Sequence, residues 1–244
     1  MSEITAHDAD VSDRVSTLWA VVPAAGSGRR FGSEIPKQYL ILQDQPIMLH
    51  SINRLFALPL AGCVIAIAAG DTQAQTLDYQ SLDRIQFVVG GAERMDSVLA
   101  GLEYLKDKAA VDDWILVHDV ARPCITPTSL RRLVNELHDH EIGGILATPV
   151  RDTLKQVQDH NILATIPRDN LWQAQTPQMF RFGVLYDALI AAKKQGLQVT
   201  DEASAIELAG LSVKIVEGRM DNIKITYADD LALADVILQA QQHI

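Results

Sequence analysis

Residues 20–37 read AVVPAAGSGRRFGSEIPK, and this stretch organises the rest of the chain. The apolar run Leu18–Val22 predicts a buried strand that ends at Pro23. The glycines that follow predict a loop whose backbone can approach a ligand closely, because glycine permits positive φ and carries no Cβ. Free N–H groups in such a loop form a concave site for anions, and Arg30, its neighbouring arginine and Lys37 add positive charge. The stretch therefore predicts a polyphosphate site.

Two common phosphate-binding loops do not fit this stretch. A P-loop requires glycine followed by lysine, and the chain contains no such pair. The dinucleotide fingerprint G-x-G-x-x-G is one residue shorter than the spacing of Gly26, Gly28 and Gly32. A dehydrogenase also needs an acidic residue at the end of its second strand, and here Ala68 is followed by another alanine, a glycine and only then Asp71. A dehydrogenase is disfavoured, and the absence of NAD binding would exclude it.

Composition places the chain among ordinary globular proteins. Its 244 residues are 48% hydrophobic, which suffices for one large domain, and we expect residues 1–17 to be a flexible tail before a single domain at 18–244. The formal net charge of −10 disfavours nucleic acid as a partner and means that a nucleotide needs locally concentrated positive charge.

Nothing in the sequence predicts a membrane or a secretory destination. No run approaches the ~18 apolar residues of a membrane span, and the N-terminus lacks a basic region followed by an apolar one. Cys63 and Cys124 are isolated, so we expect reduced thiols rather than a disulfide or a metal pair. These features predict a cytoplasmic protein.

The remaining pattern predicts an α/β fold. Continuous apolar runs alternate with segments of helical spacing, which is typical of a mostly parallel sheet with helices on both faces. We expect further strands at 64–68, 86–89, 114–118 and 144–148, and helices at 47–56, 94–106, 127–138 and 228–241. The last helix should pack through Leu231, Leu233, Ala234, Ile237 and Leu238. Ligands bind at the carboxyl ends of such strands, where the motifs of this chain fall.

Two of these motifs carry chemistry. GGAERMDS, residues 90–97, should open a helix whose N-terminus favours anions, with Arg94 and Ser97 one turn apart. HDVARP, residues 118–123, offers Asp119 as an oxygen ligand for Mg²⁺ or another divalent cation, and Arg122 to balance a phosphate. A helix cap with a solvated arginine and a structural Asp–Arg pair are the plainer interpretations.

Residues 149–172 interrupt the α/β pattern. The segments 150–155 and 162–166 alternate polar and apolar residues around a turn at 158–161, which predicts a hairpin outside the main sheet. A lone hairpin is marginal in water, so we expect it to pack on a second copy of the chain. Arg151, Thr153, Lys155 and Arg168 lie on or beside this hairpin. A surface hairpin with solvated charges remains the alternative.

The C-terminal third contributes one further cation. QTPQ (175–178) and TDEAS (200–204) are predicted to be turns before helices, with mainly structural roles. Strands are expected at 213–216 and 223–226, and the second of them carries Lys224. A lysine in an apolar strand is either an edge charge or directed at a ligand.

Together these motifs resemble the 2-C-methyl-D-erythritol 4-phosphate cytidylyltransferases, a family with a Rossmann-like nucleotidyltransferase fold. The resemblance runs through the glycine loop with its PKQY extension, the GGAERMDS and HDVARP motifs, the hairpin and the DNIK segment at 221–224. The family usually has alanine where this chain has Val120, which removes no functional group. The resemblance implies transfer of a cytidylyl group from CTP to methylerythritol phosphate with release of pyrophosphate, in the non-mevalonate isoprenoid pathway.

The resemblance also implies a role for each candidate residue. Transition-state stabilisation and catalysis would fall to Arg30, Lys37, Arg168 and Lys224. CTP would be bound by Pro23, Ala24, Ala25, Gly26, Gly90, Gly91, Arg94, Ser97, Asp119 and Val120. The acceptor phosphate would be bound by Arg122, Thr153, Arg168 and Lys224, and Mg²⁺ by Asp119, with Asp221 as a weaker second ligand. The resemblance further implies a homodimer formed through the arm at 149–172, which completes the neighbouring active site. Arg151, Thr153, Lys155 and Arg168 would then be candidates for binding the phosphate of the second substrate.

Two other functions share the first loop. A different sugar- or polyol-phosphate nucleotidyltransferase would be separated by a nucleotide panel scored by pyrophosphate release. A non-catalytic nucleotide-binding protein would bind CTP and release no pyrophosphate, although the retained Arg30, Lys37, Asp119 and Lys224 argue against it.

Overall fold

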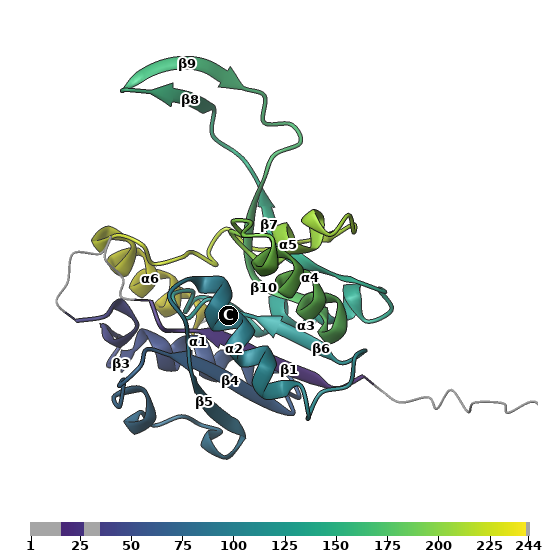
Figure 1. Cartoon of the computed structure of the whole chain (residues 1–244). Helices are drawn as coiled ribbons and strands as arrows, with labels where there is room; N and C mark the ends of the chain where they lie inside the picture. Colours follow the sequence, from purple (N-terminus) through teal and green to yellow (C-terminus); the bar gives the residue numbers. More distant parts are fainter. Residues whose placement is uncertain (1–15, 27–34, 243–244) are drawn as a thin grey trace, which may run out of the picture.

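The core of the molecule is a seven-stranded sheet. A computed structural model describes residues 16–26 and 35–242, and the sheet order is β11-β7-β10-β6-β1-β4-β5 (Figure 1). The strands in chain order are β1 (Leu18–Pro23), β4 (Gly62–Ile67), β5 (Ile85–Val89), β6 (Trp114–Val117), β7 (Gly143–Pro149), β10 (Trp172–Arg181) and β11 (Lys214–Glu217).

β1, the strand that leads into the glycine loop, lies in the interior of this sheet, between β6 and β4. β1 pairs in parallel with β4 and with β6, so Val21 lies between Val64 and Val117. The carboxyl ends of β1 and β6 therefore open side by side. The predicted parallel sheet is confirmed at β1, β4, β5 and β6, while β10 runs antiparallel to both β6 and β7.

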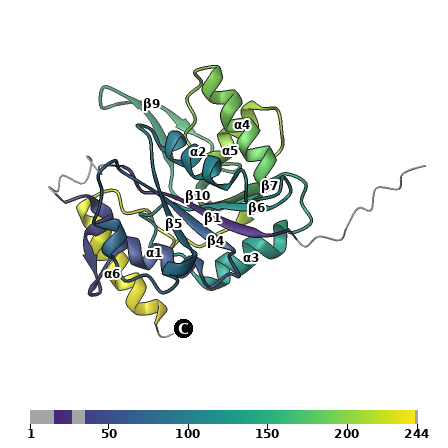
Figure 2. The ribbon, with the colours of Figure 1, turned by 60° about the horizontal axis from the view of Figure 1, so that its bottom comes forward.

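Helices cover both faces, as the alternating pattern predicted (Figure 2). One face packs against α1 (Ile47–Leu55) and α3 (Pro127–Leu137). The other packs against α2 (Arg94–Leu105), α4 (Phe182–Lys194) and α5 (Glu202–Leu208). Consecutive residues of β1 serve the two cores in turn, since Val22 belongs to the first and Val21 to the second.

A third cluster attaches the C-terminal helix α6 (Ala228–Gln241). Ala234 and Leu238 are buried against Ile47 and Ile225, and Leu231 and Ile237 are partly buried. The expectation that Leu233 packs was wrong, because its side chain faces away from this cluster and is 51% exposed.

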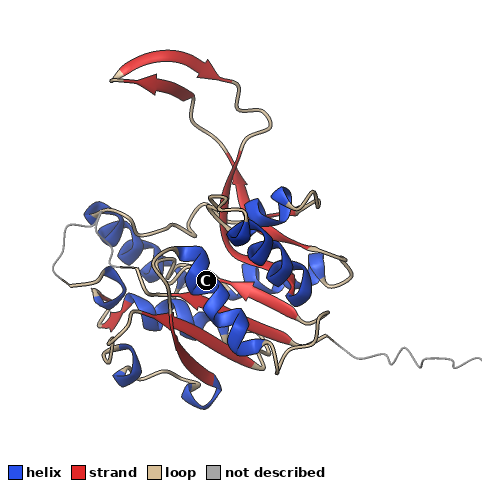
Figure 3. Cartoon of the chain, viewed as in Figure 1, coloured by secondary structure: helices blue, strands red, loops and turns tan. Residues whose placement is uncertain are grey.

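The arm stands apart from the body of the molecule. β8 (Leu154–Gln158) and β9 (Asn161–Ile166) form an antiparallel two-stranded sheet that projects beyond the main sheet (Figures 1 and 3). The hairpin is confirmed, and Asp159 and His160 at its tip adopt the positive φ of a tight hairpin turn. Its first strand begins later than the predicted 150–155, since residues 150–153 connect β7 to the arm.

Two predictions for the C-terminal third were wrong. QTPQ (175–178) is part of strand β10, where a bulge between Ala174 and Gln178 accommodates the proline. Residues 223–226 form no strand, because this segment crosses the strand ends instead of joining the edge beside β11. It is held by the amide of Ile225, which donates to the carbonyl of Ala121.

The smaller elements complete the description. A two-stranded ribbon is formed by β2 (Ile41–Leu42) and β3 (Gln45–Pro46), and single 3-10 turns lie at η2 (Lys37–Tyr39), η3 (Ala74–Thr76) and η4 (Leu82–Arg84). None of the helices in the described part of the chain has both the length and the apolar character that crossing a bilayer requires.

Candidate active site

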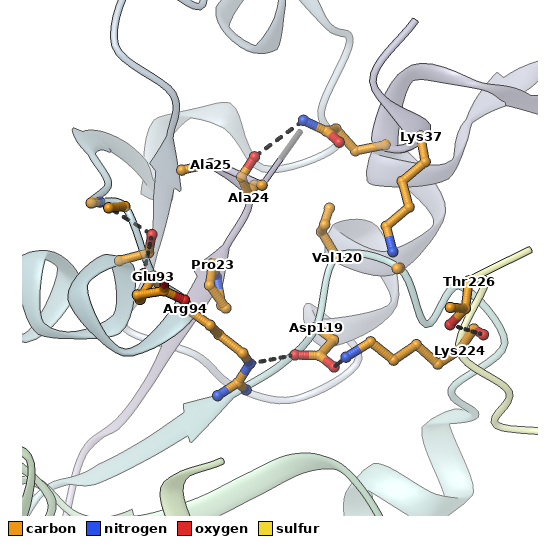
Figure 4. Close-up of a pocket in the computed structure, with 16 residues that line it drawn as sticks. Pro23, Ala24, Ala25, Lys37, Glu93, Arg94, Asp119, Val120, Lys224 and Thr226 are labelled. Carbon is orange, nitrogen blue, oxygen red and sulfur yellow. Dashed lines mark hydrogen bonds and ion pairs between the residues drawn. The ribbon is translucent and has the colours of Figure 1, made fainter. Parts of the chain in front are cut away.

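A cavity of about 350 Å³ opens at the carboxyl ends of β1 and β6 (Figure 4). The first turn of α2 forms one wall and the loop before α6 forms another. The predicted site residues that line it are Pro23, Ala24, Ala25, Gly26, Lys37, Gly91, Arg94, Ser97, Asp119, Val120 and Lys224. Four separate motifs of the sequence thus converge on one cavity.

Backbone hydrogen bonds fix the start of the glycine loop. The amide of Ala24 donates to the carbonyl of Ala66 at 2.7 Å, which extends the pairing of β1 with β4. The buried Gln38 side chain donates from Nε2 to the carbonyl of Ala24 at 3.1 Å. Residues 27–34, including Arg30, lie outside the described residues. The PKQY segment is therefore tied to the beginning of the loop by a side chain that the sequence did not single out.

The GGAERMDS motif opens α2 as predicted. Glu93 and Asp96 form a reciprocal capping box at the helix start, and the amide of Gly91 donates to Ser97 Oγ at 3.2 Å. Gly90 lies behind the cavity wall, where an added Cβ would come within 2.7 Å of Ala25. The glycine therefore permits the close packing of the α2 entry on the β1 loop.

Asp119 lies at the centre of the site. Arg94 Nε lies 2.9 Å from its Oδ1, and Lys224 Nζ lies 2.6 Å from its Oδ2, so the two cations reach it from different sides (Figure 4). Arg122 Nε lies 3.9 Å from Oδ2, and the backbone amide of Asp119 donates to Thr176 Oγ1. Burial alone would raise the pKa of this carboxyl, but the surrounding cations hold the pKa well below its usual range.

Arg94 has a second carboxylate partner, which sequence reasoning missed. Its Nη1 and Nη2 lie 2.6 and 3.0 Å from the two oxygens of Glu202, whose side chain is 1% exposed. Burial raises the pKa of Glu202, and the Arg94 guanidinium opposes that rise. Glu202 belongs to the TDEAS motif, for which the sequence predicted a mainly structural role; Asp201 of the same motif caps the helix by accepting from the amide of Ser204. Nothing in the sequence distinguishes Glu202 from an exposed first-turn glutamate.

Lys37 faces the cavity from the side opposite Arg94 and the start of α2 (Figure 4). Its Nζ donates to the carbonyl of Ile225 at 3.0 Å, so the PKQY segment contacts the loop that carries Lys224. Lys224 lies on this loop rather than on the predicted strand, and its side chain is 37% exposed. Lys37 and Lys224 therefore add two ammonium groups to the cavity, beyond the guanidinium of Arg94.

Other candidates lie outside the cavity wall. Arg122 lies beside Asp119, and its Nη1 donates to the carbonyl of Asn222 at 2.7 Å. The carboxylate of Asp221 is bound by Arg219. Thr153 and Arg168 are exposed at the base of the arm, where Arg168 Nη1 donates to the carbonyl of Arg151.

The buried His118 supports the site as a neutral ring. Burial lowers the pKa of His118 to about 4. Its Nε2 lies 3.2 Å from the carbonyl of Arg122, and its Nδ1 lies 3.0 Å from Thr176 Oγ1. The ring thereby links the turn after β6 to β10, and it does not face the cavity.

The side chains around the cavity determine how a metal ion could be coordinated there. Among the described residues, no group of three or more histidine, cysteine and carboxylate side chains is gathered in a way that could hold a metal ion. Asp119 contributes one carboxylate to the cavity wall, with Glu202 on the far side of Arg94. A metal ion at this site would therefore take most of its ligands from the substrate and from water, as Mg²⁺ commonly does.

Comparison with known proteins finds one family over most of the chain. The family model of 2-C-methyl-D-erythritol 4-phosphate cytidylyltransferase matches residues 18–240. A protein of that name from Acinetobacter baumannii is 53% identical over 225 residues, covering 92% of this chain and 94% of its own length. One from Azoarcus sp. is 49% identical over 224 residues, covering 90% and 93%. The crystal structure of the Francisella tularensis enzyme of that name superposes with a TM-score of 0.79 at 36% identity, covering 91% of this chain and all of that one.

Proposed function

The chain belongs to the 2-C-methyl-D-erythritol 4-phosphate cytidylyltransferase family, and we propose that the cavity around Asp119 is where it joins CTP to methylerythritol phosphate. The family and fold make it a cytidylyltransferase of the methylerythritol phosphate pathway, with a Rossmann-like nucleotidyltransferase fold. The observation that carries the assignment of the site is the convergence of Arg94, Lys37 and Lys224 on one cavity at the ends of β1 and β6.

The chemistry demands positioning and charge neutralisation more than proton transfer. An oxygen of the acceptor phosphate attacks the α-phosphorus of CTP, the new P–O bond forms, and the bond to the bridging oxygen of the β-phosphate breaks. Pyrophosphate leaves with that oxygen, giving 4-diphosphocytidyl-2-C-methyl-D-erythritol. The acceptor is already an anion at neutral pH, so no strong base is needed, and the barrier lies in bringing two anions together.

The residues divide this work according to their place in the cavity. The loop from Pro23 to Gly26, with Arg94 and Ser97 on α2, would bind the nucleotide, because backbone amides and a helix start favour anions there. Lys37 would stabilise the charge that develops on the α-phosphate, together with Arg30 from the glycine loop. Lys224 lies across the cavity from α2 and would hold the acceptor phosphate (Figure 4).

A divalent cation, Mg²⁺ or a similar ion, fits this arrangement as a companion of CTP. Asp119 is a buried, ionised carboxylate at the cavity wall, which would hold the ion together with substrate phosphates. When bound, the ion supplies positive charge to the triphosphate. Arg94 pairs with one oxygen of Asp119 and Lys224 with the other, so an ion held there would compete with these cations for the carboxylate, most readily with the partly exposed Lys224. Asp221 is proposed only as a second ligand after separation from Arg219.

The arm is proposed to form a homodimer that completes the neighbouring site. Large apolar side chains on it are open to solvent, with Val157, Ile162 and Leu163 each more than half exposed. An isolated hairpin carrying such side chains needs a surface to pack on, and a second copy provides one. Thr153 and Arg168 at its base would then bind the acceptor phosphate of the other subunit, and Arg122 would support them.

The two buried free thiols, Cys63 and Cys124, support a cytoplasmic setting.

The test of this function is a panel scored by pyrophosphate release. We expect release with CTP, Mg²⁺ and methylerythritol phosphate, and release at least ~100-fold slower with ATP, GTP or UTP, or with a hexose 1-phosphate as acceptor. Equal rates with a sugar 1-phosphate would favour a different nucleotidyltransferase, and CTP binding without release would favour a nucleotide-binding protein.

A further inference from the structure

The start of α5 has no role in the function described so far, although its first residue reaches the nucleotide cavity through Arg94. Both oxygens of Glu202 receive hydrogen bonds from the two terminal nitrogens of Arg94, at 2.6 and 3.0 Å. Arg94 Nε, the third donor position, is directed at Asp119. A bidentate pair of this kind fixes the plane of a guanidinium as well as its distance.

We propose that Glu202 is a positioning residue for CTP: it fixes the Arg94 guanidinium so that one edge faces Asp119 and the cavity. The proposal deepens the function given above and rests on it. Glu202 does not line the cavity, so it acts through Arg94 and not on the substrate.

The two residues next to Glu202 are hydrogen-bonded to one buried side chain of the central sheet. Gln178 on β10 is buried and donates from Nε2 to Asp201 Oδ2 at 2.8 Å, while its Oε1 accepts from the amide of Ala203 at 2.9 Å. The helix residues on both sides of Glu202 are thus tied to the central sheet. This contact also gives a role to the QTPQ and TDEAS motifs, because Gln178 of the first is hydrogen-bonded to Asp201 and Ala203 of the second, the two neighbours of Glu202.

Burying the charge of Glu202 costs free energy of folding, so packing of the helix does not explain a carboxylate at this position. A buried carboxylate loses its hydration, and in the described part of the chain its pairing with Arg94 is the contact that offsets that loss. The helix itself has other anchors, because Asp201 caps it and Ala203, Ala205 and Ile206 are buried in the core beside α4. An apolar side chain at 202 would serve the packing of α5 at least as well.

Loss of the Glu202 charge would release the terminal nitrogens of Arg94. Among the described residues, Asp119 Oδ1 would then be the remaining partner of the guanidinium, through Nε, so its plane could rotate while Lys224 keeps its contact with Oδ2. The cavity edge that α2 presents to the nucleotide would change, while Lys37 and the acceptor side would stay as they are. The expected consequence is a change confined to CTP recognition.

The test is a double-substitution cycle on Glu202→Gln and Arg94→Gln, read by steady-state kinetics and by calorimetric binding of CTP. We expect E202Q to raise KM and Kd for CTP about 10-fold, with KM for methylerythritol phosphate unchanged within about 2-fold. In the Arg94→Gln background, E202Q should have no further effect on KM for CTP, because Glu202 acts only through Arg94. Independent, multiplicative effects on KM for CTP would overturn the proposal.

Ile206→Ala is the matched control for a merely structural role. It removes buried volume from the same helix without touching Arg94, so it lowers the melting temperature but leaves KM for CTP unchanged. If E202Q behaves like this control, the proposal is wrong. Should E202Q fail to fold, Glu202→Asp replaces it: the carboxylate is withdrawn by one methylene and KM for CTP still rises, whereas an unchanged KM overturns the proposal.

Failure of this proposal is distinguishable from failure of the proposed function. The wild-type enzyme is assayed first for pyrophosphate release from CTP with methylerythritol phosphate. Absence of release there would refute the function. Normal wild-type release together with unaltered CTP kinetics in E202Q would refute only the role of Glu202.

Discussion

Lys224 Nζ lies 2.6 Å from Asp119 Oδ2, so a lysine from the loop before α6 neutralises the carboxylate at the end of β6. The contact joins the last functional segment of the chain to the centre of the sheet. Asp119 is buried while Lys224 is partly exposed, so the lysine can change partners more readily than the carboxylate can. It can leave the carboxylate for the phosphate of an incoming acceptor without crossing the protein interior.

Replacing this lysine should damage use of the acceptor much more than binding of CTP. For Lys224→Gln we expect kcat/KM for methylerythritol phosphate to fall at least ~100-fold, because a charge-assisted contact to a phosphate is lost. Kd for CTP, measured by calorimetry, should change by less than about 3-fold. Lys194→Gln on the exposed face of α4 is the matched control and should retain wild-type kinetics. A K224Q enzyme with normal acceptor kinetics would remove Lys224 from the mechanism.

The basic residues of the first stretch should govern turnover. We expect Arg30→Ala and Lys37→Ala each to lose at least ~100-fold in kcat, since donors aimed at developing charge contribute on this scale. Circular dichroism and melting temperature should show that both variants remain folded. Wild-type turnover in either variant would show that the charge at the α-phosphate is stabilised elsewhere.

If the arm completes the active site of a second subunit, as proposed, mixing two inactive variants should restore activity. Arg168→Ala and Lys37→Ala should each be nearly inactive alone, because one lacks the arm cation and the other the loop cation. Mixed dimers formed after unfolding and refolding them together should contain one intact site, restoring about a quarter of wild-type activity at equal amounts (half of the dimers, with one active site each). No recovery, with mixed dimers demonstrated by mass spectrometry, would show that each arm serves its own subunit.

The two cysteines should react only when the chain unfolds. Burial raises the pKa of Cys63 and of Cys124 to about 12, against an ordinary value near 9. The unfolded chain therefore binds fewer protons than the native one between pH 9 and 12, and these thiols contribute stability that is lost as pH rises through that window. At pH 9 we expect iodoacetamide to label neither cysteine in native protein and both in denaturant. Rapid labelling of the native form would contradict the burial.

The sequence was informative where residues interact locally. The glycine loop, the α2 entry and the turn after β6 are read from short motifs, because strand ends and helix caps depend on neighbours along the chain. Their convergence also followed, since parallel strands place their carboxyl ends at one edge. The sequence therefore predicts one site that contains Pro23, Arg94, Asp119 and Lys37.

Long-range pairing set the limit of that reasoning. QTPQ resembled a turn because proline normally interrupts strands, yet a bulge admits it into β10, and its Gln178 then supports α5. Lys224 was placed on a strand by its apolar neighbours, but backbone and side-chain bonds to Ala121 and Thr176 hold the segment across the strand ends. Glu202 was missed because nothing local marks a first-turn glutamate as buried.

The most direct test of the central claim is a crystal structure of the enzyme with CTP and Mg²⁺. We expect the triphosphate to occupy the cavity between α2 and the loop before α6, with the α-phosphate within hydrogen-bonding reach of both Lys37 Nζ and Arg30. Lys224 should no longer pair with Asp119, and Arg168 of the second subunit should face the acceptor side. A triphosphate bound elsewhere, with Lys37 and Lys224 left in their present contacts, would contradict the account.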